Sequence, residues 1–160
     1  HAALAQRGPV GLILSRQNVP TLVDAASALA NVHRGAYVVA DSPAPQVLLL
    51  ATGSEVQLAV QAHARLADQG VAARVISMPC LEWFDAQEQA YRDSVLLPSV
   101  RARVAVEAGA TLGWWRYVGD RGRVVGLDHF GASAGGPQLF DAFGITVDAV
   151  VTGALASLRG

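Results

Sequence analysis

The sequence contains no lysine, because all twelve of its basic residues are arginine. A mechanism that depends on a lysine side chain is therefore excluded. Cys80 is the single cysteine, so no internal disulfide can form, which fits the reducing conditions of a cytoplasmic location. Charged residues make up 16% of the chain, against roughly 25% in an average soluble domain. This shortfall suggests that part of the surface is buried against a partner or a neighbouring domain.

The charge balance and the first residues argue against further classes of partner and of targeting segment. The net charge is −1, which gives no electrostatic reason to expect nucleic acid or an acidic membrane as a partner. No uninterrupted apolar run reaches the length that crosses a bilayer. The first residues, HAALAQR, have no basic region followed by a long apolar core, so they are not a signal peptide. Because the sequence also lacks a starting methionine, we interpret it as a fragment.

Apolar runs alternate with segments of helical periodicity along most of the chain. This alternation predicts an α/β fold with three layers: an open, mixed, mostly parallel sheet of about five strands with helices on both faces. Residues 10–15 (VGLILS) form a further strand candidate, and residues 19–34 are typical of a connection with a short helical piece. Strands are expected at 36–40, 46–51, 71–77, 103–106 and 123–127, and helices at 55–69, 85–96, 112–118, 137–143 and 146–158.

The turn Thr52-Gly53-Ser54-Glu55 is the first candidate site, since it follows a strand and opens a helix. Free backbone N–H groups of Gly53, Ser54 and Glu55 could hold an anion there. The simpler interpretation is a glycine bend with a hydroxyl N-cap and a first-turn glutamate, and the caps of ordinary helices favour it. The turn lacks the glycine spacing of a dinucleotide fingerprint and the lysine of a P-loop.

The remaining reactive residues point more to structure than to chemistry. Cys80 has no histidine nearby in sequence, so a buried apolar cysteine is favoured over a nucleophile. His129 follows a strand and is interpreted as a loop histidine, while Glu107 ends an apolar strand and has either a functional role or bonds to nearby N–H groups. The aromatic cluster of Trp114, Trp115 and Tyr117 suits packing or an interface. With one cysteine and scattered histidines, no metal site is expected.

Arg16 ends the apolar run 10–15 beside Ser15 and Gln17. A guanidinium has the fixed two-pronged geometry that binds phosphate, although surface ion pairing explains such a residue equally well.

Seven segments in order resemble the end of a transketolase chain. Together they cover nearly the whole sequence, and although each match is weak, their order and spacing are specific. The segments are Gly8–Asn18 (GPVGLILSRQN), Arg34–Val39 (RGAYVV), Ala51–Val56 (ATGSEV), Arg74–Pro79 (RVISMP), Tyr91–Val95 (YRDSV), Arg103–Gly109 (RVAVEAG), and Phe130–Ser133 (FGAS) with Phe143-Gly144.

The resemblance implies three parts. Residues 1–18 are expected to be the terminal strand of the preceding pyrimidine-binding domain, 19–34 a linker, and 35–160 the C-terminal domain. The family transfers two-carbon ketol units between sugar phosphates of the pentose phosphate pathway as a cytoplasmic homodimer. In the parent enzyme the cofactors are thiamine diphosphate and a divalent metal, Mg²⁺ or Ca²⁺.

Only one functional residue carries over from the family to this sequence. Arg16 matches the arginine that holds the substrate phosphate. Gly119-Asp120-Arg121 is not the family's Gly-Asp-Gly cofactor motif, and Glu107 is not its cofactor-activating glutamate. The resemblance therefore implies no catalytic, cofactor-binding or metal residue in this chain. It implies a structural, dimer-supporting domain whose partners are the remaining domains and a second subunit, and which is inactive alone.

Two segments, residues 132–138 and the stretch around Cys80–Trp83, differ from the commonest sequences of the family. We interpret both differences as sequence variation in loops or at the surface that implies no new activity. Two other interpretations of the function stay open. One is a related thiamine enzyme, such as a dihydroxyacetone synthase or the β-type subunit of a 2-oxo-acid dehydrogenase, the latter disfavoured by Ser15–Asn18. The other is a free-standing small-ligand or regulatory module, which would leave the apolar run 10–15 unexplained.

Overall fold

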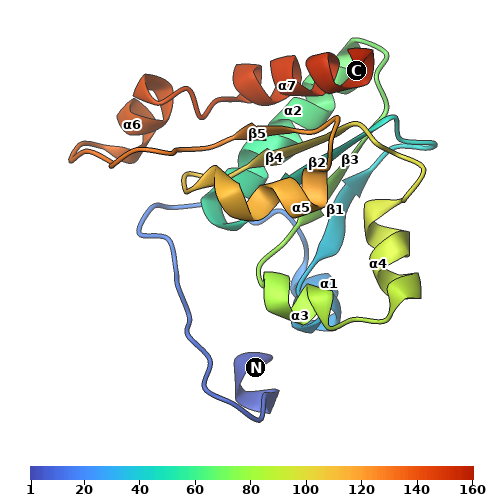
Figure 1. Ribbon diagram of the computed structural model, residues 1–160. Coiled ribbons are helices and arrows are strands. Elements are labelled where there is room, and N and C mark those ends of the chain that lie inside the picture. Colours follow the sequence, from blue (N-terminus) through green and yellow to red (C-terminus); the bar gives the residue numbers. More distant parts are fainter.

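A single mixed sheet organises the chain in the computed structural model, which describes all 160 residues. Its strand order is β1-β3-β2-β4-β5. Only β1 runs antiparallel to its neighbour, β3, while the other three pairs are parallel. The predicted α/β class, mixed sheet and number of strands are thus confirmed (Figure 1). The strands are β1 (Tyr37–Asp41), β2 (Val47–Ala51), β3 (Ala73–Ser77), β4 (Arg103–Val106) and β5 (Arg123–Val125).

The central strand β2 is buried along its whole length. All five of its residues, VLLLA, have no exposed surface. A strand flanked by parallel neighbours and covered on both faces needs such a continuous apolar sequence. Burying one leucine side chain stabilises a fold by about 1.5–3 kcal/mol, so Leu48, Leu49 and Leu50 together form a large part of the core.

Two long helices cover one face of the sheet, α2 (Val56–Asp68) and α7 (Val147–Arg159). Their inward residues, among them Leu66 and Val150, join Leu49 in one buried cluster. The predicted start of α7 is also confirmed, since the Thr146 hydroxyl accepts a hydrogen bond from the amide of Ala149 at 3.1 Å.

Shorter helices cover the opposite face: α3 (Leu81–Asp85), α4 (Gln89–Leu96), the 3₁₀ turn η4 (Thr111–Trp114) and α5 (Trp115–Val118). Phe84, Trp114 and Tyr117 pack there on Leu48 and Leu50. Burial, with the nearby Asp85 carboxylate that accepts from the phenol, raises the pKa of Tyr117 to about 12. The aromatic cluster predicted to pack therefore contributes Trp114 and Tyr117 to the core, while Trp115 stays half exposed.

One sequence prediction was wrong in detail. The helix expected at 85–96 begins only at Gln89, because Glu88 is extended (φ −58°, ψ 146°), and Asp85 is instead the last residue of the separate helix α3. Residues 10–15 pair with no strand of this sheet, and their assignment to the terminal strand of a preceding domain stays a prediction. The connection 19–34 contains the helix α1 (Ala25–Asn31) and the 3₁₀ turn η2 (Val32–Arg34), and the short turn η1 (Ala3–Ala5) lies near the N-terminus.

The segment 136–159 is long and apolar enough by composition to cross a membrane. It is nevertheless not one continuous helix, because Gly144 (φ +69°) separates α6 (Gly136–Ala142) from α7. The apolar side of α7, with Val150 and Ala154 fully buried, packs against the sheet.

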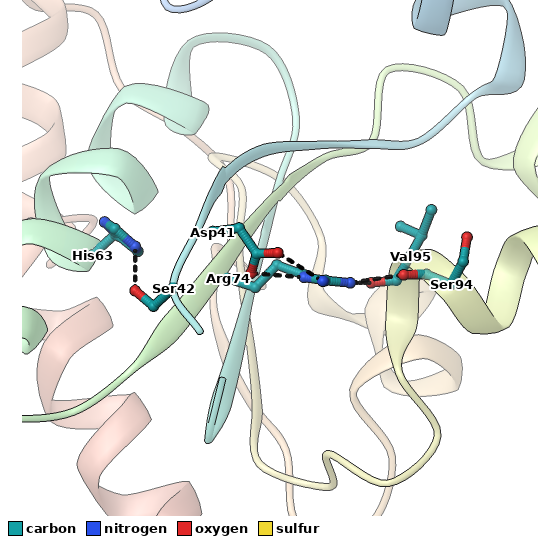
Figure 2. A network of polar contacts seen from close by, with 6 residues as sticks. All are labelled: Asp41, Ser42, His63, Arg74, Ser94 and Val95. Atoms are coloured by element: carbon teal, nitrogen blue, oxygen red, sulfur yellow. Dashed lines mark hydrogen bonds and ion pairs between the residues drawn. The ribbon is translucent and has the colours of Figure 1, made fainter. Parts of the chain in front are cut away.

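Polar contacts fasten the antiparallel edge to both helical layers (Figure 2). The Arg74 guanidinium donates to the Asp41 carboxylate at 3.0 and 2.7 Å and to the carbonyl of Ser94 at 2.7 Å. It thereby joins β1 and β3 to the end of α4. On the other face, the Ser42 hydroxyl lies 3.0 Å from Nε2 of His63 on α2.

Gly35 closes η2 in the left-handed conformation, with φ +83°. A Cβ atom at this position would lie 2.3 Å from the Cys80 carbonyl oxygen and 2.3 Å from the Phe84 amide nitrogen. Since both contacts are to backbone, neither can move aside by a side-chain rotation. The close approach of η2 to α3 therefore depends on glycine.

We expect Gly35→Ala to lower the free energy of unfolding by about 3 kcal/mol or more, through a strained φ and a backbone clash together. Urea denaturation of the purified chain measures this loss. Gly113→Ala is the matched control, since its Cβ would meet nothing within 4 Å. It should change stability by only about 0.5 kcal/mol. Equal losses in the two variants would contradict this account of Gly35.

Candidate functional site

A crevice of about 650 Å³ opens at the carboxyl ends of β2, β3 and β4. The connection after β2 passes through α2 to β3 on one side, and the connection after β4 passes through η4 and α5 to β5 on the other. The chain thus turns in opposite directions after two adjacent parallel strands. In open α/β sheets, this switch point is where ligands bind.

The turn after β2 forms one wall of the crevice. Gly53 adopts φ +55° and starts the 3₁₀ turn η3 (Gly53–Glu55), which leads into α2. The Ser54 hydroxyl donates to Glu55 Oε1 at 2.7 Å, and Glu55 is only 5% exposed. The predicted hydroxyl N-cap was wrong, because no side-chain cap bond forms at Thr52 and the Ser54 hydroxyl is used by Glu55.

Burial is also the main reason why the pKa of Glu55 is raised. Removing a carboxylate from water disfavours its charged form. The nearby negative charge of Glu107 raises the pKa further, and the hydrogen bond from Ser54 partly offsets both effects.

Glu107, at the end of β4, forms the second wall. Its Oε2 accepts a hydrogen bond from the indole N–H of buried Trp114 at 2.6 Å. The second oxygen of Glu107 has no hydrogen-bond partner in the chain. The Glu55 carboxylate, in contrast, also interacts with the backbone N–H groups of Glu55 and Ala108, which act to lower its pKa. The crevice therefore presents one carboxylate oxygen, on Glu107, whose hydrogen-bonding capacity is unused.

The residues after β3 complete the inner part of the crevice. Cys80 lies 3.5 Å from Glu82, measured from Sγ to Oε2. Burial raises the pKa of the Cys80 thiol, which disfavours the thiolate that a nucleophile needs. The prediction of a buried cysteine was wrong in degree, because Cys80 is only partly buried and lines the crevice.

The N-terminal segment between Gly11 and Gln17 lies across the opening. Arg16 belongs to this wall, is exposed, and makes no hydrogen bond or ion pair. The side chain of Gln17 lies against Gly136, where a Cβ would come within 2.9 Å of Gln17 Oε1. The crevice thus brings together Arg16, Glu107 and the turn 52–55, which are far apart in the sequence.

His129 lies outside the crevice. Its ring packs edge-on against Phe143 at 5.0 Å between centroids, and its Nδ1 lies 2.8 Å from the carbonyl oxygen of Phe130. The neighbouring Asp128 accepts from the amide and hydroxyl of Thr111 at 2.9 and 2.7 Å, and these bonds lower the pKa of Asp128. Both residues hold a loop in place.

The charges of the crevice are three carboxylates and one guanidinium: Glu55, Glu82, Glu107 and Arg16. Such an excess of negative charge disfavours an anion at residues 53–55, which stays a prediction. No group of three or more His, Cys, Asp or Glu side chains is arranged to hold a metal ion. Glu82 was missed by the sequence reasoning, as was the inward direction of Glu55. The signal for both was their place just after neighbouring strands.

Comparison with known proteins gives one consistent family. A family model described as the transketolase-like TK C-terminal domain matches residues 35–146. The chain is 52% identical over 155 residues to a transketolase of Mycobacterium leprae, and this alignment covers 94% of the chain and 22% of that protein.

Solved structures agree. The transketolase from Leishmania mexicana matches with 45% identity and a TM-score of 0.75 over 82% of this chain and 19% of its own. A transketolase from Pichia stipitis, in a complex with sedoheptulose-7-phosphate, matches with 35% identity and a TM-score of 0.81 over 90% of this chain and 20% of its own. The chain therefore spans about a fifth of the length of these relatives.

The raised pKa of Glu55 predicts a pH-dependent cost of folding. Below the ordinary carboxyl value of 4.5 the group is protonated in both states and costs nothing. As the pH rises toward the higher folded-state pKa, the unfolded state loses its proton more readily, and the cost grows. Glu55→Gln keeps an oxygen for the Ser54 hydroxyl and removes the charge. We therefore expect it to stabilise the chain at pH 7, with an advantage that shrinks toward pH 4.

Urea denaturation between pH 4 and pH 7 measures this difference. The matched control is Glu88→Gln, since Glu88 is exposed and makes no side-chain cap bond to α4. If the advantage of Glu55→Gln did not vary with pH, burial of a charged Glu55 would not be its cause.

Proposed function

The chain belongs to the transketolase family and corresponds to its C-terminal domain, and from this we propose that it is the terminal part of an enzyme that transfers two-carbon ketol units between sugar phosphates. The observation that carries the proposal is 52% identity over 155 residues, which extends beyond the 112-residue range matched by the family model, 35–146. No contact in the crevice favours a free-standing ligand-binding module or another thiamine enzyme.

The proposed role of this chain is structural. Transketolases are dimeric enzymes of several domains that generally use thiamine diphosphate and a divalent metal. The crevice does not suit a diphosphate, because its three carboxylates would repel that anion, and no metal-binding group of side chains is present. We therefore assign the cofactors to the other domains of a cytoplasmic homodimer in the pentose phosphate pathway.

Residues 1–18 are proposed to be the terminal strand of the preceding pyrimidine-binding domain, followed by a linker at 19–34 and the C-terminal domain at 35–160. Support comes from the apolar side chains of Leu12, Ile13 and Leu14, which are 72%, 100% and 81% exposed. An apolar, extended segment without a pairing partner is suited to completing another sheet.

Within this segment, Arg16 is proposed to bind the phosphate of the sugar substrate. Its guanidinium is exposed and makes no internal ion pair, so it is available to a ligand. A phosphate contact is remote from the bond that breaks. It should therefore contribute mainly to binding and orientation rather than to stabilising the reacting centre.

In the full-length enzyme, we expect Arg16→Ala to raise KM for phosphorylated donors about ten- to hundredfold with little change in kcat. A charge-assisted hydrogen bond contributes about 1.5–3 kcal/mol, which gives this range. An unphosphorylated donor should be almost unaffected. Steady-state kinetics with both donor classes measure the effect, and Arg7→Ala, an exposed arginine of the same segment, is the control. Equal losses with both donors would make Arg16 a structural residue.

The 160-residue chain alone is expected to bind no thiamine diphosphate and to transfer no ketol group. Calorimetric titration with thiamine diphosphate and Mg²⁺ should therefore give no heat of binding. The full-length enzyme, titrated in the same way, is the positive control. A micromolar affinity in the isolated chain would refute the assignment of the cofactor to other domains.

A further inference from the structure

A second crevice, of about 360 Å³, lies between the helices α3, α4 and α5. It shares no residue with the crevice at the carboxyl ends of the strands. Its charged residues are the arginines Arg92, Arg103 and Arg116 and the aspartates Asp85 and Asp93. Positive charge is therefore in excess here, whereas the first crevice has an excess of negative charge.

Two of the three guanidinium groups have no carboxylate partner. Arg116 pairs with Asp85, which also accepts a hydrogen bond from the Tyr117 hydroxyl at 3.0 Å. Arg92 and Arg103 take part in none of the four ion pairs of the chain. The one carboxylate that remains against them, Asp93, accepts from the side-chain amide of Gln89. The crevice thus keeps a net positive charge that attracts anions.

Arg103 is held at the base of this crevice by neutral groups. Its guanidinium donates to three backbone carbonyl oxygens, at 3.0, 2.7 and 2.9 Å. These bonds fix the orientation of the side chain without neutralising its charge. Burial disfavours that charge and lowers the pKa of Arg103. An anion in the crevice would offset this loss of hydration.

Arg92 supplies an unused hydrogen-bond donor. Its Nε is the one buried side-chain nitrogen or oxygen in the chain without a partner. Buried donors are almost always paired in folded proteins. The guanidinium itself donates to the carbonyl oxygen of Asp85 at 3.3 Å and to Gln89 Oε1 at 2.6 Å. Because the first of these bonds is longer than usual, a charged acceptor in the crevice can replace it and turn Nε toward itself.

We propose that the crevice between α3, α4 and α5 is a binding site for a phosphate group, either free phosphate or a small phosphate monoester, held by the guanidinium groups of Arg92 and Arg103. A doubly charged group with several oxygens suits two guanidinium groups better than a single carboxylate does. The site is separate from the substrate phosphate proposed at Arg16, and it does not depend on the proposed function.

Nuclear magnetic resonance of the arginine Nε–H groups tests the proposal in the 160-residue chain, which has two buried clusters of its own. Inorganic phosphate is added while sodium chloride is withdrawn to keep the ionic strength constant. The resonance of Arg92 Nε–H should shift and saturate with a Kd of about 1 mM, a weak affinity suited to an open crevice. A parallel titration with glycerol phosphate distinguishes the two sources, because tighter binding of the ester identifies a monoester as the ligand.

Variants separate a specific site from general attraction of anions, with affinity measured from the backbone amides of residues 89–96. Arg92→Gln should weaken phosphate binding about ten- to hundredfold, as the loss of one charge-assisted contact predicts. Arg116→Gln leaves Arg92 in place but frees the charge of Asp85, and it should weaken binding about two- to fivefold. Arg65→Gln is the control and should have no effect, because Arg65 pairs with Asp148 outside the crevice.

The proposal is overturned if Arg92 Nε–H does not shift, or if its shift grows linearly without saturating. Equal affinities in the chain as it stands and in a folded Arg92→Gln variant would also overturn it. If Arg92→Gln does not fold, an unchanged affinity in Arg116→Gln has the same meaning, since the charge of the crevice would then have no influence on binding.

Discussion

The structure depends on one constraint, the complete burial of β2 between two helical layers. A five-residue strand can lose all its exposed surface only if neighbouring strands, here both parallel, occupy its two edges and helices cover both faces. The alternation of side chains then assigns Val47, Leu49 and Ala51 to the layer of α2 and α7, and Leu48 and Leu50 to the layer of α3, α4 and α5. The rest of the fold supplies the cover that this strand requires.

The same constraint creates the crevice. Since β3 and β4 lie on opposite sides of β2, the chain leaves adjacent strands in opposite directions and opens a gap at their carboxyl ends. Many α/β proteins place a glycine-rich, phosphate-binding turn at such a gap. Here the turn carries Glu55, and Glu107 faces it from the next strand, so the fold is retained while the chemistry of the switch point is different.

Much of the fold could be predicted from sequence, because continuous apolar runs identify buried strands and the hydroxyl of Thr146 identifies a helix start. The break between α3 and α4 was not predictable from periodicity, since Glu88 leaves the helical path within a segment rich in helix formers. The run 10–15 has the composition of a strand but no partner, and pairing is a property of the whole sheet. For the site, strand ends indicated Glu107 and residues 52–55. The burial of Glu55 required coordinates, because nothing local distinguishes a buried carboxylate from a first-turn glutamate.

The two edges of the sheet differ in how far they complete their own polar contacts. At the amino edge, the Arg103 guanidinium donates to the carbonyls of Val100, Tyr117 and Leu96 at 3.0, 2.7 and 2.9 Å. Burial lowers the pKa of this arginine, yet its hydrogen bonds hold the loops before β4 and β5 together. The hydroxyl of Ser157 on α7 accepts a hydrogen bond from the Arg103 amide and donates one to the Arg121 carbonyl.

The carboxyl edge is less closed, because one oxygen of Glu107 has no partner in the chain and Phe130 faces water. Polar groups inside proteins are almost always paired. An edge that stays in water has to satisfy its own polar groups, as the amino edge does through Arg103. The carboxyl edge instead leaves a carboxylate oxygen of Glu107 and the side chain of Phe130 to solvent, so a chain with few charged residues presents a polar crevice beside exposed apolar side chains.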